Sequence, residues 1–105
     1  MKTQALEDAI VAMKLDPRTL AHCADMARVL VESRTLRENM RGDIARMGYP
    51  SEPVARSIHD EARVRAATLI VLAERVLSGV GIDCGRSTDD ASDAVVAIER
   101  ASWRT

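Results

Sequence analysis

The sequence predicts an all-α protein: a single domain of 105 residues containing a long antiparallel helical hairpin and two shorter flanking helices. Three observations support this class. No stretch alternates apolar and polar residues with the period of two that is typical of a half-buried strand. Ala, Glu, Arg and Leu, which favour helices, dominate the chain. Pro and Gly stand where helices would begin or end. We expect helices at about 4–15, 17–47, 52–78 and 88–102.

The first two helices meet at a clear boundary. An apolar stripe with spacings of four and three, starting at Leu6, predicts residues 4–15 as an amphipathic helix. Asp16 is a typical N-cap, and Pro17 suits the first position of the helix that follows. Gly48 and Pro50 end that helix, because a glycine after the last turn and a nearby proline disfavour continuation.

Similar signals delimit the last two helices. Ser51 is the expected N-cap of residues 52–78, with Pro53 in the first turn, and an apolar stripe then follows one face of the helix. Gly79 and Gly81 end it. Ser87 and Asp90 have the spacing of a capping box at the start of residues 88–102.

The length of the two central helices predicts self-association. A helix of 30 residues is about 45 Å long, whereas a compact chain of this size has a radius of gyration of about 13 Å. Residues 66–73 are apolar around the whole helix, which predicts burial on every side. We expect two hairpins to pack as a homodimer, with a monomeric bundle kinked near Gly42 as the alternative. The expected dimer interface consists of apolar hairpin residues: Leu69, Ile70, Leu72, Val76, Met40 and Ile44.

Composition excludes several classes of protein. Hydrophobic residues make up 47 % of the chain, but 16 residues are alanine and Phe is absent, so the core is thin. A net charge of −1 argues against a dedicated nucleic-acid or membrane-surface binder. The longest apolar run, residues 66–73, is too short to span a bilayer. With no signal-peptide pattern and two cysteines, we expect a cytoplasmic, reduced protein.

The sequence offers little chemistry. The metal-ligand candidates are Cys23 with its neighbour His22, His59 and Cys84. In a hairpin turning near residue 50, His59 falls at the opposite end from Cys23 and Cys84, which excludes a four-ligand zinc site. No phosphate-binding glycine motif or nucleophile elbow occurs. We therefore expect no enzymatic activity, no metal and no cofactor.

Charged and aromatic residues suggest where a partner binds. Arg34, Arg37 and Arg41 recur at spacings of three and four, and Arg63 is expected opposite Arg37 across the hairpin. This basic face suits an acidic protein or a nucleic acid. The alternative is a solvated face neutralised by the nearby carboxylates. The two large aromatics, Tyr49 and Trp103, lie at helix ends and are candidate contact anchors or simple end caps.

The layout also resembles that of a known group of small helical proteins. The matching fragments are Ala9-Ile10-Val11-Ala12, Pro17 with Leu20, Thr35-Leu36, Arg46-Met47-Gly48 and Gly81-Ile82. In this order they resemble small all-helical anti-CRISPR proteins of phages, in particular inhibitors of type I-E systems, over about two thirds of the chain. The resemblance implies a homodimer that blocks a protein surface of the CRISPR–Cas machinery without catalysing a reaction. It transfers no individual binding residue.

The sequence thus favours a non-enzymatic protein-binding module, a mobile-element-encoded inhibitor of a host defence complex. Its expected partners are a second copy of itself and a host protein such as a CRISPR–Cas subunit, with no membrane involvement. Two alternatives stay open. One is a small nucleic-acid-binding protein that uses the arginine face, and the other is a purely structural dimerisation module.

Overall fold

The computed structural model describes residues 2–104 and contains four α-helices. They are α1 (Lys2–Met13), α2 (Pro17–Met47), α3 (Pro53–Val80) and α4 (Thr88–Arg104). The predicted all-α class is confirmed, and each helix end lies within two residues of the position expected from the sequence. Among the described residues, no helix combines the length and hydropathy needed to cross a membrane.

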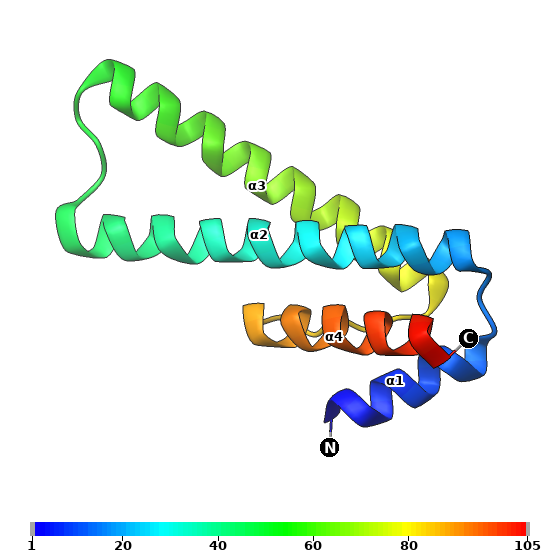
Figure 1. Cartoon of the computed structure of the whole chain (residues 1–105). Helices are drawn as coiled ribbons and strands as arrows, with labels where there is room; N and C mark the ends of the chain where they lie inside the picture. The colour runs from blue at the N-terminus through cyan, green and yellow to red at the C-terminus, as the bar shows by residue number, and fades with distance from the viewer. Residues whose placement is uncertain (1, 105) are drawn as a thin grey trace.

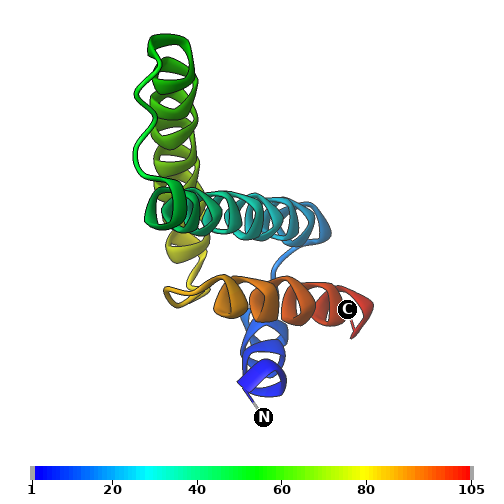
Figure 2. The same ribbon diagram turned by 90° about the vertical axis from the view of Figure 1, so that its left-hand side faces the viewer.

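Helix α2 is the central element of the fold (Figure 1). It packs against α3 on one side and α4 on the other, and α1 packs against α4. Figure 2 shows that α4 lies alongside α2 in the opposite direction, whereas α3 and α1 run across them. Within residues 2–104, α3 packs against no helix except α2. Most of the circumference of α3 is therefore left uncovered.

The helix boundaries follow from local capping. The Asp16 carboxylate accepts a 2.8 Å hydrogen bond from the Thr19 amide, and Pro17 occupies the first turn of α2. Ser87 and Asp90 form the expected capping box before α4. The cap of α3 differs from the prediction: Glu52, not Ser51, accepts hydrogen bonds from the first amides of that helix. The longer carboxylate reaches two of these amides at once, which a serine hydroxyl cannot do.

The core is built largely from alanine. Ala27 of α2, Ala73 of α3 and four alanines of α4 are completely buried, so their small side chains let the helices approach closely. The α4 alanines are Ala91, Ala94, Ala97 and Ala101. Larger aliphatic residues fill the remaining space, among them Leu30, Leu77 and Ile98.

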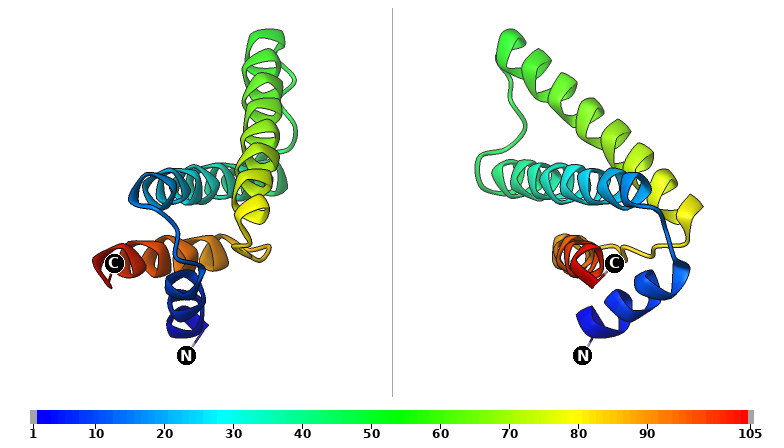
Figure 3. Two further views of the ribbon diagram at one scale, coloured as in Figure 1. Left: turned by 90° about the vertical axis from the view of Figure 1, so that its right-hand side faces the viewer. Right: turned by 45° about the vertical axis from the view of Figure 1, so that its right-hand side comes forward.

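The hairpin of α2 and α3 is open at its loop end. The two helices meet in their inner halves and diverge toward residues 48–52, as Figures 1 and 3 show. Burial follows the same pattern: no residue of α2 is buried beyond Arg34, and none of α3 is buried before Ala66. Arginines and a histidine face each other across the outer halves, and close packing there would desolvate like charges. The projecting outer halves account for a radius of gyration of 16.1 Å and a length of 52 Å.

Candidate functional site

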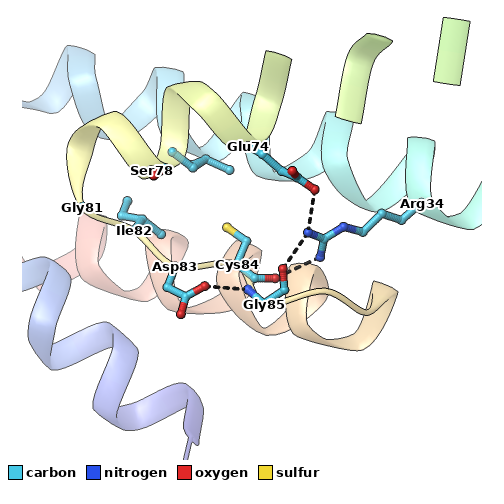
Figure 4. Close-up of a pocket in the computed structure, with 9 residues that line it drawn as sticks. Arg34, Glu74, Ser78, Gly81, Ile82, Asp83, Cys84 and Gly85 are labelled. Carbon is cyan, nitrogen blue, oxygen red and sulfur yellow. Dashed lines mark hydrogen bonds and ion pairs between the residues drawn. The ribbon is translucent and has the colours of Figure 1, made fainter. Parts of the chain in front are cut away.

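Arg34 was expected on an exposed basic face, and the structure corrects this. Its side chain is 1 % exposed and points into the loop between α3 and α4 (Figure 4). The guanidinium donates hydrogen bonds to the carbonyls of Cys84 at 2.9 Å, Ser87 at 2.7 Å and Gly85 at 2.8 Å. It also forms a 3.2 Å ion pair with Glu74. Arg34 is thus a structural residue that fixes this loop, and it is not available to a partner.

The hollow beside Arg34 has a volume of about 340 Å³, but the side chains around it are poorly suited to catalysis. Burial raises the pKa of the Cys84 thiol to about 11, so the reactive thiolate is scarce near neutral pH. Burial also raises the pKa of Cys23. Glu74 is engaged by Arg34. Within residues 2–104, no three His, Cys, Asp or Glu side chains gather closely enough to hold a metal ion.

A second cavity lies between the diverging halves of α2 and α3. It has a volume of about 330 Å³, and its walls combine basic and apolar side chains. Its lining residues are Arg37, Met40, Arg41 and Ile44 of α2, and His59, Arg63, Ala66 and Ala67 of α3. We call it the α2/α3 cleft. Three of the four predicted basic residues therefore share one cavity, and Arg63 does face it together with Arg37.

The carboxylates expected to neutralise this basic face are directed elsewhere. None of them lines the cleft, and each has another partner. Glu38 accepts from Thr88, Asp43 pairs with Arg46, Asp60 accepts from Tyr49 and Glu61 pairs with Arg65. No ion pair joins Arg37, Arg41 or Arg63 to any other side chain within residues 2–104. The guanidinium groups of Arg37, Arg41 and Arg63 therefore have no carboxylate bonded to them within the part of the chain that the structure describes.

Two nitrogen atoms in the cleft wall lack a partner. Arg37 Nε and His59 Nε2 are shielded from solvent, and neither makes a hydrogen bond with the described residues. Buried polar atoms are normally paired, because an unpaired donor loses its bond to water without replacement. Arg37 Nε always carries a proton, and His59 Nε2 carries one in one of its two tautomers, so an added acceptor at this position would be favourable.

Tyr49 is engaged by residues of its own chain. Its ring makes an edge-to-face contact with His59, with centroids 5.0 Å apart, and the Arg56 guanidinium lies 5.4 Å from the ring centroid. Its hydroxyl donates a hydrogen bond to Asp60. Tyr49 is still 43 % exposed, so the edge of its ring is accessible to a partner. Its contacts within the chain hold the 48–52 loop against α3.

The residues predicted for the dimer interface do not share one surface. Leu69 and Leu72 are exposed on α3, at 39 % and 52 %, and Val76 is half-buried. Ile70 is instead buried against the rest of the chain at 3 % exposure, so it is not a surface residue. It shares the α2-facing side of α3 with Ala66, Ala73 and Leu77, which recur at helical spacing. Met40 and Ile44 line the α2/α3 cleft.

The side of α3 that faces away from α2 is uncovered and carries several exposed apolar side chains among charged ones. Val64 is 59 % exposed and Val71 is 46 % exposed, in addition to Leu69 and Leu72. A shallow hollow of about 370 Å³ runs along Ala67, Thr68, Val71, Leu72 and Arg75. We call Val64, Thr68, Leu69, Val71 and Leu72 the outer face of α3, a broad surface on which Leu69 and Val71, two residues apart, lie at opposite edges. Within one chain, residues 66–73 are thus not buried on every side as the sequence suggested.

Trp103 lies at the edge of a further hollow, which sequence reasoning missed. Its side chain is 78 % exposed. The hollow has a volume of about 460 Å³ and is formed between α2 and α4, with Leu20, Ala24 and Ile98 among its lining residues. The sequence signal that could have indicated this contact is the helical spacing of small residues on α2 and α4.

No protein-family model matches the chain, and neither a curated protein nor a solved structure matches it. We therefore argue its function from the surfaces described above.

Proposed function

We propose that this chain is a non-enzymatic protein-binding module that docks through the outer face of α3. The observation that supports this is the exposure of four large aliphatic side chains on one helix: Val64, Leu69, Val71 and Leu72. Large aliphatic side chains gathered in an exposed position on one helix are costly in water and commonly mark an interaction surface. Within residues 2–104, α2 is the one helix that α3 packs against, so a partner can reach this face without moving another helix.

The first partner we propose is a second copy of the chain. Leu69, Leu72 and Val76 follow each other at spacings of three and four, the spacing with which two helices pack side by side. Two outer faces related by a twofold axis would bury this patch on both chains. A thin, alanine-rich core is the kind that gains stability from such an association.

The second partner we propose is a host defence protein, with the chain acting as an inhibitor encoded by a mobile element. The resemblance to phage inhibitors of type I-E CRISPR–Cas systems supports testing that machinery first. The activity would be cytoplasmic, which suits the two free thiols, Cys23 and Cys84, since a reducing compartment keeps thiols unpaired.

Two other functions are each supported by a specific observation. A small nucleic-acid-binding protein is favoured by the three arginines of the cleft that make no ion pair. A purely structural dimerisation module is favoured by the same outer face of α3. The experiments below separate these functions from the main proposal.

Self-association is tested by measuring molar mass in solution with light scattering. We expect a dimer for the wild type and a monomer for Leu69→Ser/Leu72→Ser, because the two substitutions remove both leucines of the stripe that ends at Val76. Val96→Ser is the matched control: Val96 is 39 % exposed on α4, away from this face, and the variant should remain dimeric. A monomeric wild type would contradict the self-docking proposal.

Inhibition is tested with a purified type I-E surveillance complex and its helicase-nuclease. We expect stoichiometric, nuclease-resistant binding to one of them and loss of target-DNA degradation. Binding that disappears after nuclease treatment would instead support the nucleic-acid alternative. A dimer that binds neither component would leave the purely structural function as the better description.

A further inference from the structure

The geometry of the α2/α3 cleft leads to a second proposal. We propose that this cleft binds an acidic helix of a protein partner, with its carboxylates paired to Arg37, Arg41 and Arg63. The inference rests on the proposed function only in assuming that the ligand is a protein. It concerns a different surface from the outer face of α3, so each proposal can fail without the other.

The charge pattern of the cleft is the first argument. Three guanidinium groups and His59 converge on one cavity, and no carboxylate lines it. The acidic residues that flank the cleft have partners of their own, so they do not fold back into it. An arginine binds a carboxylate through paired hydrogen bonds, and such charge-assisted bonds are stronger than neutral ones.

The unpaired nitrogens give the second argument. Arg37 Nε and His59 Nε2 are hidden from solvent without an acceptor, although they lie on opposite walls of the same cavity. A carboxylate that enters between α2 and α3 supplies an acceptor to Arg37 Nε, and also to His59 Nε2 in the tautomer that carries its proton on that atom. Binding then relieves an unfavourable feature of the free chain as well as forming new contacts.

The apolar walls favour a protein over a nucleic acid. Met40, Ile44 and Ala66 contribute methyl and methylene groups, which gain nothing from a sugar-phosphate backbone but pack against leucine or valine side chains. A groove between two helices that joins apolar and charged groups is a common receptor for an amphipathic helix. The cleft has this composition.

Neighbouring residues also disfavour a nucleic acid. Glu38, Asp60 and Glu61 lie on the same helical segments and would repel a long polyanion, whereas a helix with a few carboxylates avoids them. Tyr49, the nearby aromatic, is already in contact with His59 and Arg56, so it offers no free ring for stacking a base.

The test uses a defined peptide as the probe. It is a fluorescent amphipathic peptide of about 14 residues, or four helical turns, made of Glu, Leu and Ala with one leucine face. A second peptide carries Gln in place of every Glu. Binding to the protein is measured by fluorescence anisotropy, with a DNA duplex of about 20 base pairs as a competitor probe.

The cleft variant is Arg37→Gln/Arg41→Gln/Arg63→Gln. Its matched control is Arg46→Gln/Arg65→Gln/Arg75→Gln, which removes the same charge from exposed positions that do not line the cleft. We expect the Glu peptide to bind the wild type and the control, and to bind the cleft variant about tenfold more weakly or less. The Gln peptide should show the same loss with the wild type.

Three results would overturn the proposal. One is an equal loss of binding in both variants, which would indicate attraction by overall charge. Another is cleft-dependent binding of the DNA duplex that is tighter than binding of the Glu peptide. The third is no detectable peptide binding at about 1 mM.

A second measurement covers the case in which the cleft variant fails to fold. Adding the Glu peptide to the wild type should shift the NMR signals of the Met40 methyl group and the Arg63 side chain, while those of Met26 and Arg18 stay in place. Shifts confined to residues outside the cleft would contradict the proposal. Light scattering on the same samples shows whether the outer face of α3 still associates, which separates the two failures.

Discussion

The guanidinium of Arg34 donates a 2.9 Å hydrogen bond to the backbone carbonyl of Cys84, which lies 50 residues further along the chain. Together with its bonds to Gly85 and Ser87, this contact ties the loop before α4 to the middle of α2. One buried side chain therefore fixes the loop from which α4 begins.

Arg34→Met should destabilise the fold severely. The substitution keeps most of the side-chain volume but leaves the buried carbonyl of Cys84, two partly buried carbonyls and Glu74 without their donor. We expect the free energy of unfolding to fall by about 3 kcal/mol or more, as measured by urea denaturation. Arg18→Met, at an exposed position of the same helix, should change it by less than about 0.5 kcal/mol. An equal effect of both variants would show that Arg34 has no special structural role.

Two glycines should respond to alanine in opposite directions. A Cβ atom at Gly85, which has a φ of +57°, would lie 2.4 Å from a carboxylate oxygen of Asp90. Gly85→Ala should therefore lower stability by about 1 kcal/mol or more. Gly42 lies inside α2, and nothing within 4 Å would meet its Cβ, so Gly42→Ala should raise stability by about 0.5–1 kcal/mol. Thermal unfolding of both variants checks the two signs.

Asp90 should make stability depend on acid pH. The Lys2 ammonium group, followed by the amide and hydroxyl of Ser87, lowers the pKa of the Asp90 carboxyl below its ordinary value. A carboxyl with a lowered folded-state pKa stabilises the fold fully above its unfolded pKa of about 3.9, and this contribution is lost as pH falls toward the folded value.

The test compares Asp90→Asn with the wild type across pH. The urea midpoint of the variant should be lower by a constant amount between about pH 5 and 8, and the difference should shrink below about pH 4. Asp89→Asn is the control, because it removes a charge from the same helical turn without removing the capping bonds. A difference that does not change with pH would contradict this role.

The alanine stripe of α4 should not tolerate larger side chains. Ala97 is completely buried, and it lies seven residues from both Asp90 and Arg104, whose side chains pair with residues of α1. Ala97→Leu would therefore push α4 away from α1 and lower the free energy of unfolding by about 1–3 kcal/mol. Ala45→Leu, at an exposed position of α2, should leave it nearly unchanged. Urea denaturation measures both variants, and equal stabilities would show that the contact between the helices is loose.

The Cys84 thiol should react slowly with a disulfide reagent. Its pKa of about 11 leaves little thiolate at pH 8, and its side chain is 7 % exposed. We expect its reaction to be at least about tenfold slower in the folded protein than in urea. The reaction is monitored by the thiolate that the reagent releases, in the Cys23→Ala variant, which leaves Cys84 as its thiol. Equal rates in the two conditions would mean that the loop opens readily.

Local features of the fold were predictable from the sequence. Asp16 with Pro17, and Ser87 with Asp90, act through hydrogen bonds within one turn, so their residue types alone indicate where α2 and α4 begin. The convergence of Arg37 and Arg63 was also predictable, because pairing positions across a hairpin needs only the place of the turn.

Features that depend on contacts between distant segments were not predictable. Arg34 and Arg37 occupy equivalent places in the same basic stripe, and only the return of the 81–87 loop buries the first and leaves the second in the cleft. Leu69 and Ile70 are neighbours in an apolar run, and the crossing of α3 over α2 decides which of them is buried. Sequence periodicity carries no information about these contacts.

The open hairpin makes α3 a lever with its pivot at the crossing with α2. The outer half of α3, from Pro53 to residue 65, is about 20 Å long. A rotation of about 10° at the pivot therefore moves its tip by about 3.5 Å, roughly the thickness of a methylene layer. Small changes in packing at Ala66, Ile70 and their neighbours thus set the distance between the outer ends of α2 and α3. The small alanine side chains at the crossing therefore determine how far the tip of α3 stands from α2.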